Sequence, residues 1–242
     1  MLLHNIDMER HLYSQYSRLT QPNELELLRP DECEFYSQTI IGHRQHWKPR
    51  DSRVGFYTLG TPAYLDASKS IHKYCQIAQE NNIIVMSISE SLLEQVLRCI
   101  CEMMQLKKAW TRHLPETAYP GFHIFYHTEI TSQARTTMHR DMQFQKIRPL
   151  ITRILEGVTD KRIMPISFTV ALRLPLSGGG LKCRVSDGAV KRFKYEAGRL
   201  YLHDGLCPHK IDDEYKSVRG DYRITLQGHG VITTDGRFYY YW

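Results

Sequence analysis

Paired cysteines are missing from this 242-residue sequence. No two cysteines are separated by the two residues of a C-x-x-C pair, and no framework spacing recurs. This argues against a structural zinc site built from cysteines and against a disulfide scaffold. The sequence therefore predicts reduced thiols, as expected for a cytoplasmic protein. The scattered cysteines are Cys33, Cys75, Cys99, Cys101, Cys183 and Cys207.

Long apolar runs, internal repeats and a strong charge imbalance are also missing. No run is long enough to span a bilayer, and charged residues interrupt the first 18 residues, where a signal peptide would need an apolar core. The formal charge is +6, from 32 Lys+Arg against 26 Asp+Glu, and it is spread along the chain. We therefore expect a soluble protein without a membrane partner, and the charge does not favour nucleic acid as a partner.

The first 119 residues show mainly helical patterns. Residues 66–82 predict a helix capped by Asp66 or Ser68 and ended by the two asparagines. Residues 89–113 predict a second helix, capped by Ser89 or Ser91, with one apolar face. Between these two segments, the run "IIVMSIS" is typical of a short strand.

After Pro120 the pattern changes to short β-rich runs separated by Gly, Pro and Asp turns. Examples are "GFHIFYHTEITS", "ARTTMHRD", "MPISFTVALRLP" and "YRITLQGHGVIT", whereas residues 145–162 indicate a connecting helix or long loop. Many short strands in succession are typical of a sandwich or barrel. The sequence predicts an α+β protein, with an N-terminal helical layer packed against a C-terminal barrel.

The run "TTMHRDMQF" contains a histidine and an aspartate separated by one residue, His139 and Asp141. Residues i and i+2 of a strand share a face, so both side chains could hold one ion. A non-haem iron triad of two histidines and a carboxylate needs a second histidine. His203 and His209 are both available in "GRLYLHDGLCPHKI". We favour His209, which follows an apolar strand and a Gly turn, and keep His203 as the alternative.

Arg223 and Thr225 alternate with Ile224 and Leu226 in "YRITLQGHGV". If the apolar pair faces the helical layer, the arginine points into the barrel. A buried guanidinium needs a partner, and no acidic residue in the sequence is an evident one. A bound carboxylate could fill this role through two parallel hydrogen bonds, and the Thr225 hydroxyl could add another.

Taken in order, His139-x-Asp141, His209 and Arg223-x-Thr225 resemble the iron(II)/2-oxoglutarate-dependent oxygenases. The resemblance covers roughly residues 120–240 and is nearest to bacterial phytanoyl- and prolyl-hydroxylase-like enzymes that act on amino acids and natural products. It implies a single oxygenase domain over residues 1–242. Residues 120–242 would form its double-stranded β-helix, or jelly-roll, core, and residues 1–119 its mainly helical part.

The resemblance also implies a chemistry. His139, Asp141 and His209 would hold Fe(II), and 2-oxoglutarate would bind the iron and place its far carboxylate on Arg223 and Thr225. With O2 as the other cosubstrate, such an enzyme hydroxylates an unactivated C–H of a small molecule, for example an amino acid or a biosynthetic intermediate, and releases succinate and CO2. Related halogenases lack the carboxylate that Asp141 supplies, so hydroxylation or a related oxidation is expected here.

Three further residues are secondary candidates. Tyr126, on the strand before His139, could reach the cosubstrate carboxylate, and Arg135 and Arg140 flank the triad and could bind substrate. Three alternatives stay open: a nucleic-acid or protein demethylase or hydroxylase of the same superfamily, a non-catalytic jelly-roll binding protein, and a zinc hydrolase. The sequence does not indicate the substrate or the oligomeric state.

Overall fold

The structure of this chain is a computed structural model. It describes residues 14, 16–17, 19, 22–68, 70–127, 137–154, 163–176, 179–185, 187–212 and 218–242. The helices are α2 (Pro30–Gly42), α3 (Ala63–Asp66), α4 (Ile71–Met104), α5 (Gln143–Lys146) and α6 (Arg148–Ile154), with 3-10 turns η2 (Arg44–His46), η3 (Ser52–Val54) and η4 (Lys108–Trp110). The strands are β1 (Asn23–Glu26), β2 (Lys48–Asp51), β3 (Phe56–Leu59), β4 (Thr111–His113), β5 (Gly121–Tyr126), β6 (Ile163–Arg173), β7 (Leu181–Arg184), β8 (Val190–Phe193), β9 (Arg199–Asp204), β10 (His209–Ile211), β11 (Tyr222–Thr233) and β12 (Phe238–Tyr241).

The strands form two sheets in the described part of the chain. The major sheet runs in the order β1-β9-β6-β11-β5-β3-β2, and β12 joins it beside β11 and carries β4 on its other side. Every strand pair in this sheet is antiparallel except β12 with β4. The minor sheet has the order β10-β7-β8 and is antiparallel throughout. The predicted α+β class is confirmed in this form: antiparallel sheets with helices packed on them.

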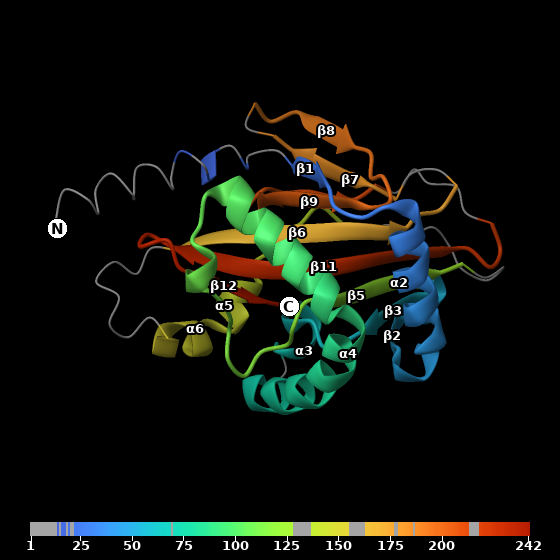
Figure 1. Cartoon of the computed structure of the whole chain (residues 1–242), viewed down its shortest axis with the longest axis horizontal. Coiled ribbons are helices and arrows are strands. Elements are labelled where there is room, and N and C mark those ends of the chain that lie inside the picture. Colours follow the sequence, from blue (N-terminus) through green and yellow to red (C-terminus); the bar gives the residue numbers. More distant parts are fainter. Residues whose placement is uncertain are drawn as a thin grey trace.

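Helices cover one face of the major sheet, as Figure 1 shows for α2 and α4. The main hydrophobic core lies between these helices and the major sheet. Leu92, Val96 and Ile100 of α4 belong to the same cluster as Ile224 and Leu226 of β11. The alternate residues of β11 then face the minor sheet, as the sequence predicted. The central strands therefore separate an apolar core from a polar face.

The two predicted helices within 66–113 are wrong as separate elements, because α4 is continuous from Ile71 to Met104. The asparagines expected to end the first helix instead bind tertiary partners: Asn81 Nδ2 donates to Thr61 Oγ1 at 2.8 Å and Asn82 Nδ2 to the Thr117 carbonyl at 3.0 Å. Ser89 is buried, and its hydroxyl donates to the Val85 carbonyl at 2.7 Å, so it does not act as a cap. Tertiary contacts thus stabilise helix through the β-branched run "IIVMSIS".

The N-terminal half also contributes strands that the sequence reading missed. Strands β1, β2 and β3 extend the major sheet, and β3 pairs directly with β5. Conversely, residues 137–141 of the predicted strand "ARTTMHRD" form only an isolated bridge at His139, and its first three residues lie outside the described residues. The predicted helix at 145–162 is present as α5 and α6 up to Ile154.

The C-terminal residue, Trp242, is an anchor between the helices and the major sheet. Its side chain is fully buried, and its ring lies so close to Gly121 that a Cβ there would meet it at 2.3 Å. A second glycine, Gly60, also lies against the ring, where a Cβ would meet it at 2.8 Å. The two glycines therefore create the space that the indole occupies.

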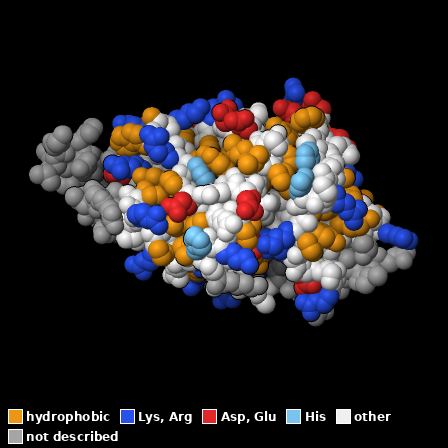
Figure 2. All heavy atoms as spheres, turned by 90° about the horizontal axis from the view of Figure 1, so that it is seen from below, with side chains coloured by type: hydrophobic (Ala, Val, Ile, Leu, Met, Phe, Trp, Pro, Cys, Tyr) orange, Lys and Arg blue, Asp and Glu red, His pale blue; other side chains and the backbone are white. Residues whose placement is uncertain are grey.

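Surface charge is mixed on the face shown in Figure 2, where Lys and Arg side chains lie among acidic and hydrophobic ones and form no continuous basic stripe among the described residues. In the same described part of the chain, no helix combines the length and the apolar character needed to cross a membrane.

Replacing the anchor should destabilise the fold. We expect Trp242→Ala to lower the free energy of unfolding by about 3–5 kcal/mol, the range for a large buried aromatic. Trp110→Ala is the matched control, because that side chain is 37% exposed, and it should change the free energy little. Urea denaturation of both variants checks this; equal losses would contradict the anchoring role of Trp242.

Candidate metal centre and its cavity

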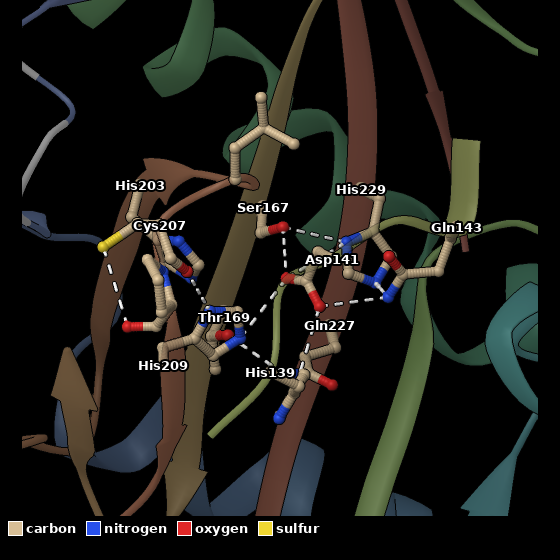
Figure 3. A network of polar contacts seen from close by, with 12 residues as sticks. His139, Asp141, Gln143, Ser167, Thr169, His203, Cys207, His209, Gln227 and His229 are labelled. Carbon is tan, nitrogen blue, oxygen red and sulfur yellow. Dashed lines mark hydrogen bonds and ion pairs between the residues drawn. The ribbon is translucent and has the colours of Figure 1, made fainter. Parts of the chain in front are cut away.

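His139 and His209 are held opposite one another by their own backbones. The His139 amide donates to the His209 carbonyl at 2.9 Å, and the His209 amide donates to the His139 carbonyl at 2.8 Å. Two residues later, the Asp141 amide donates to the Gly205 carbonyl at 2.8 Å. This pairing fixes the loop that carries His139 and Asp141 against the start of β10, so that all three side chains converge (Figure 3).

The three side chains present ligand atoms to one point. One nitrogen or oxygen atom from each of His139, Asp141 and His209 lies within 4.8 Å of the other two. The His209 Nε2 is 3.4 Å from Asp141 Oδ2, and the His139 Nε2 is 3.9 Å from Asp141 Oδ1. Two imidazoles and one carboxylate form the donor set of a facial triad, which leaves further coordination positions open.

Backbone carbonyls set the tautomer of both imidazoles. His139 Nδ1 is 2.9 Å from the Thr137 carbonyl and His209 Nδ1 is 2.8 Å from the Cys207 carbonyl. A carbonyl only accepts, so each Nδ1 carries the hydrogen and each Nε2 keeps its lone pair. Both lone pairs are directed toward the same carboxylate. A histidine that donates its other ring N–H to a backbone carbonyl is the usual outer-sphere arrangement of metal-binding histidines.

The Asp141 carboxylate is buried and is kept ionised by its neighbours. Burial alone would raise the pKa of Asp141, but the imidazoles of His209, His229 and His203, together with the Ser167 hydroxyl, hold that pKa below its ordinary value. The Ser167 hydroxyl donates to Oδ2 at 2.5 Å. A charged carboxylate therefore lines the cavity, where it can bind a cation.

A chain of hydrogen bonds orients this carboxylate from behind. Gln143 Nε2 donates to Asp141 Oδ1 at 3.1 Å and also lies 3.2 Å from His229 Nε2. His229 Nδ1 lies 3.0 Å from Ser167 Oγ. Since the Ser167 proton goes to Asp141, its oxygen accepts from His229 Nδ1, and His229 is neutral. Burial lowers the pKa of His229, in agreement with this neutral form.

The sequence reading missed Ser167 and His229 as parts of the site. His229 could have been found, because it continues the alternation of Arg223 and Thr225 along β11. Ser167 pairs directly with His229 across β6 and β11 and with His203 across β6 and β9. His203, Ser167 and His229 become neighbours only when β9, β6 and β11 pair in this register, so no local pattern in the sequence indicates the role of Ser167.

His203 lies beside the triad and not in it. Its side chain is 2% exposed, its ring centroid is 4.7 Å from that of His209, and its Nδ1 is bonded to the Asp204 carbonyl at 2.9 Å. Burial lowers the pKa of His203 to about 4. Of the two histidines that the sequence left open, the structure thus brings His209 together with His139 and Asp141.

A cavity of about 530 Å³ opens over these ligands, between the polar face of the major sheet and the minor sheet. Arg223 is 3% exposed and lines this cavity, with its Nε donating to the Gly179 carbonyl at 2.9 Å and its guanidinium carbon 5.6 Å from the Phe125 ring.

Thr225 shares the strand face of Arg223, since it pairs with His123, another cavity residue. The buried Thr225 hydroxyl has no hydrogen-bond partner among the described residues. Thr225 itself is not among the residues that line the cavity. The lining residues are Phe56, Tyr64, His123, Phe125, Thr137, His139, Arg140, Asp141, Met142, Gln143, Lys146, Leu181, Tyr195, His209, Ile211, Arg223, Gln227 and His229.

The structure does not place Tyr126, the secondary candidate for the cosubstrate, among the residues that line the cavity. Along β5, His123 and Phe125 face the cavity, whereas Ile124 faces the helices. Tyr126 lies on the same face of the strand as Ile124. Its ring stacks on Tyr222 at 4.7 Å and receives the Arg44 guanidinium at 5.0 Å. Tyr195, which the sequence reading did not single out, lines the cavity instead.

The two arginines proposed for substrate have different outcomes. Arg140 is exposed and lines the cavity next to the ligands. Arg135 lies outside the described residues.

Comparison with known proteins gives structural matches only: no family model and no curated protein matches the sequence. An N-substituted L-amino acid dioxygenase from Burkholderia ambifaria, solved with α-ketoglutarate, superposes with a TM-score of 0.52 at 11% identity, over 96% of this chain and 90% of that one. A Pseudomonas putida prolyl-4-hydroxylase gives 0.41 at 16% identity, over 89% and 96%. The α-ketoglutarate-dependent epimerase SnoN from nogalamycin biosynthesis gives 0.49 at 12% identity, over 95% and 86%. The first of these shows that the chain has the fold of that dioxygenase.

Removing one imidazole should separate the two histidine candidates. We expect His209→Ala to weaken Fe(II) binding by more than the roughly 10–100-fold that loss of an outer-sphere partner costs. His203→Gln should weaken it less, because that side chain offers no atom to the centre. Anaerobic titration calorimetry on both variants measures this. Retained affinity in His209→Ala, with affinity lost in His203→Gln, would exchange their roles.

The hydrogen bond from Ser167 gives a second prediction. Ser167→Ala removes a donor from the buried Asp141 carboxylate, and we expect Fe(II) affinity to fall about 10–100-fold. Ser89→Ala is the control, since Ser89 is equally buried but bonded within α4. If both variants bind iron as the unaltered chain does, the network behind Asp141 does not orient the ligand.

Proposed function

We propose that this protein is an Fe(II)- and 2-oxoglutarate-dependent oxygenase. One observation carries the proposal: two imidazole Nε2 lone pairs and a buried carboxylate meet at one point of a cavity, within 4.8 Å of one another. The hydrogen bonds at both Nδ1 atoms prepare these rings for a metal ion. Two histidines and a carboxylate with open positions suit non-haem iron(II).

The residues present also fit the cosubstrate. A dicarboxylate that chelates the metal would need a cationic partner for its far end, and Arg223 lines the same cavity from β11. Thr225, two residues along the same strand face, is the proposed source of a further donor, because its buried hydroxyl has no partner among the described residues. The match to a dioxygenase solved with α-ketoglutarate supports this assignment through its fold.

When bound, iron(II) and 2-oxoglutarate would supply the oxidation of an unreactive C–H by O2, with release of succinate and CO2. The protein's own residues bind and orient. His139, Asp141 and His209 fix the metal; Ser167 and Gln143 hold Asp141. The rings of Phe56 and Phe125 stack at 4.7 Å and shield the cavity from water on the β3–β5 side. Hydroxylation is the proposed outcome, because the carboxylate ligand is retained.

The proposal includes the finer architecture. We infer that the major and minor sheets, which face one another across the cavity, constitute a double-stranded β-helix, and that residues 1–242 form one oxygenase domain. The N-terminal half belongs to this domain, because β3 pairs with β5 and its Phe56 lines the cavity. A small molecule is the proposed substrate, in keeping with a cavity of about 530 Å³.

The competing functions explain fewer of these features. A zinc hydrolase would leave Arg223 and Thr225 without a role. A non-catalytic binding protein would have no use for two imidazoles prepared as ligands around a charged carboxylate. A nucleic-acid demethylase would need a basic groove with aromatic stacking residues, and the described residues on the face in Figure 2 form none.

A spectroscopic experiment tests the proposal. Fe(II) and then 2-oxoglutarate are added to metal-free protein without oxygen, and a metal-to-ligand charge-transfer band should appear only when both are present. His139→Ala should abolish the band. A folded protein that shows no band with both additions would contradict the proposed function.

Arg223→Gln should separate cosubstrate binding from metal binding. Truncating a buried charged partner costs about 2 kcal/mol or more, which corresponds to a roughly 30-fold rise in the Kd for 2-oxoglutarate. Fe(II) affinity should stay unchanged. Arg173→Gln is the control, because Arg173 pairs with Ile224 in register and its guanidinium lies over Tyr222, on the helical side. Equal 2-oxoglutarate affinity in both variants would remove the role of Arg223.

A further inference from the structure

Two cationic side chains line the cavity in addition to Arg223, which the proposed cosubstrate would use. Arg140 and Lys146 are both exposed and both line the cavity. Among the described lining residues the only carboxylate is Asp141, the proposed metal ligand. The part of the cavity left for a substrate therefore carries positive charge without a negative counterpart.

The balance of charge in the loaded site strengthens this point. The two charges of iron(II) and the charge of Arg223 would be neutralised by the Asp141 carboxylate and the two carboxylates of 2-oxoglutarate. As metal ligands through Nε2, His139 and His209 would add no charge, with each Nδ1–H donated to a backbone carbonyl. Two positive charges then remain, those of Arg140 and Lys146. A cavity with apolar walls concentrates their field and favours an anionic ligand.

Both cations are attached to fixed parts of the site. Arg140 lies between His139 and Asp141, whose backbone bonds to His209 and Gly205 hold it in place. Its side chain forms no hydrogen bond or ion pair with the described residues and lines the cavity, where a ligand can reach it. The Lys146 amine donates to the Tyr64 carbonyl at 2.8 Å, which leaves two further N–H groups.

An apolar and aromatic wall adjoins these cations. Phe56 stacks on Phe125 at 4.7 Å and meets the edge of His123 at 5.2 Å. The Tyr64 hydroxyl is 2.9 Å from His123 Nε2, and the carbonyl of the same tyrosine holds Lys146. Successive contacts thus connect the stacked rings of Phe56 and Phe125 to the Lys146 amine.

We propose that the substrate is a small molecule with an apolar body and an acidic group, and that Arg140 and Lys146 bind the acidic group. This inference rests on the proposed function. Both a carboxylate and a phosphate accept hydrogen bonds from a guanidinium and an ammonium group. The apolar body would lie against Phe56 and Phe125, and the Tyr64–His123 pair would meet its polar atoms.

Matched probes test the acidic group. N-acetyl-L-leucine and 3-phenylpropanoate are each compared with the corresponding primary amide, and 2-phenylethyl phosphate gives the phosphate arm. Each probe is titrated into the anaerobic protein loaded with Fe(II) and 2-oxoglutarate, and the shift of the charge-transfer band reports binding near the iron. We expect at least one acid to bind at least about tenfold more tightly than its amide, a difference of about 1.4 kcal/mol. The carboxylate and phosphate arms show which acid the site accepts.

Three variants assign the effect to residues. Arg140→Gln and Lys146→Gln should each raise the Kd of the bound acid about tenfold or more, while the band itself still forms. Arg148→Gln is the matched control, because Arg148 is exposed two residues from Lys146 and lies outside this cavity. Its Kd should match that of the unaltered chain.

Each remaining outcome has a definite meaning. Amides that bind as well as acids, or an acid that binds Arg140→Gln and Lys146→Gln with unchanged Kd, would overturn the assignment of an acidic substrate. Failure of every acid to shift an existing band would overturn it as well. If the loaded protein shows no band at all, the proposed function fails first and this inference falls with it.

Discussion

The burial of one charged carboxylate is the constraint on which the site depends. Asp141 is withdrawn from water, which is costly unless donors and cations surround it. The protein supplies the donors, Ser167 and Gln143, and directs two imidazole lone pairs to the same place. The three side chains therefore form a point at which a metal ion could bind, and the cavity opens beside it.

A single strand connects this site to the stability of the fold. On one face of β11, Ile224 and Leu226 pack into the core under the helices. On the other face, Arg223 and His229 line the cavity. Any shift of register by one residue would exchange the two faces, burying a guanidinium in the apolar core. The same hydrophobic packing that stabilises the major sheet thus places the functional side chains.

The N-terminal half takes part in the site as well as covering the sheet. Strand β3 brings Phe56 beside Phe125, and α3 brings Tyr64 to His123. Lys146, from α5, is bonded to the Tyr64 backbone. The cavity wall is therefore assembled from segments before and after the metal ligands, and the proposed selectivity for an acidic substrate arises where they meet.

The sequence by itself determined the chemical types in the site and their order. His139-x-Asp141 and His209 could be read from residue types and spacing, and strand periodicity set Arg223 and Thr225 on the face opposite the apolar residues of β11. The sequence also offered Tyr126 as a secondary candidate for the cosubstrate, and the structure leaves it out of the cavity lining. Local patterns divided α4 where Asn81 and Asn82 bind distant partners. Only the tertiary structure decided between His203 and His209, and only it recruited Ser167, Gln143 and Tyr64. Those choices depend on which strands and loops become neighbours, and that is set by backbone pairing and core packing over the whole chain, beyond the reach of any local pattern.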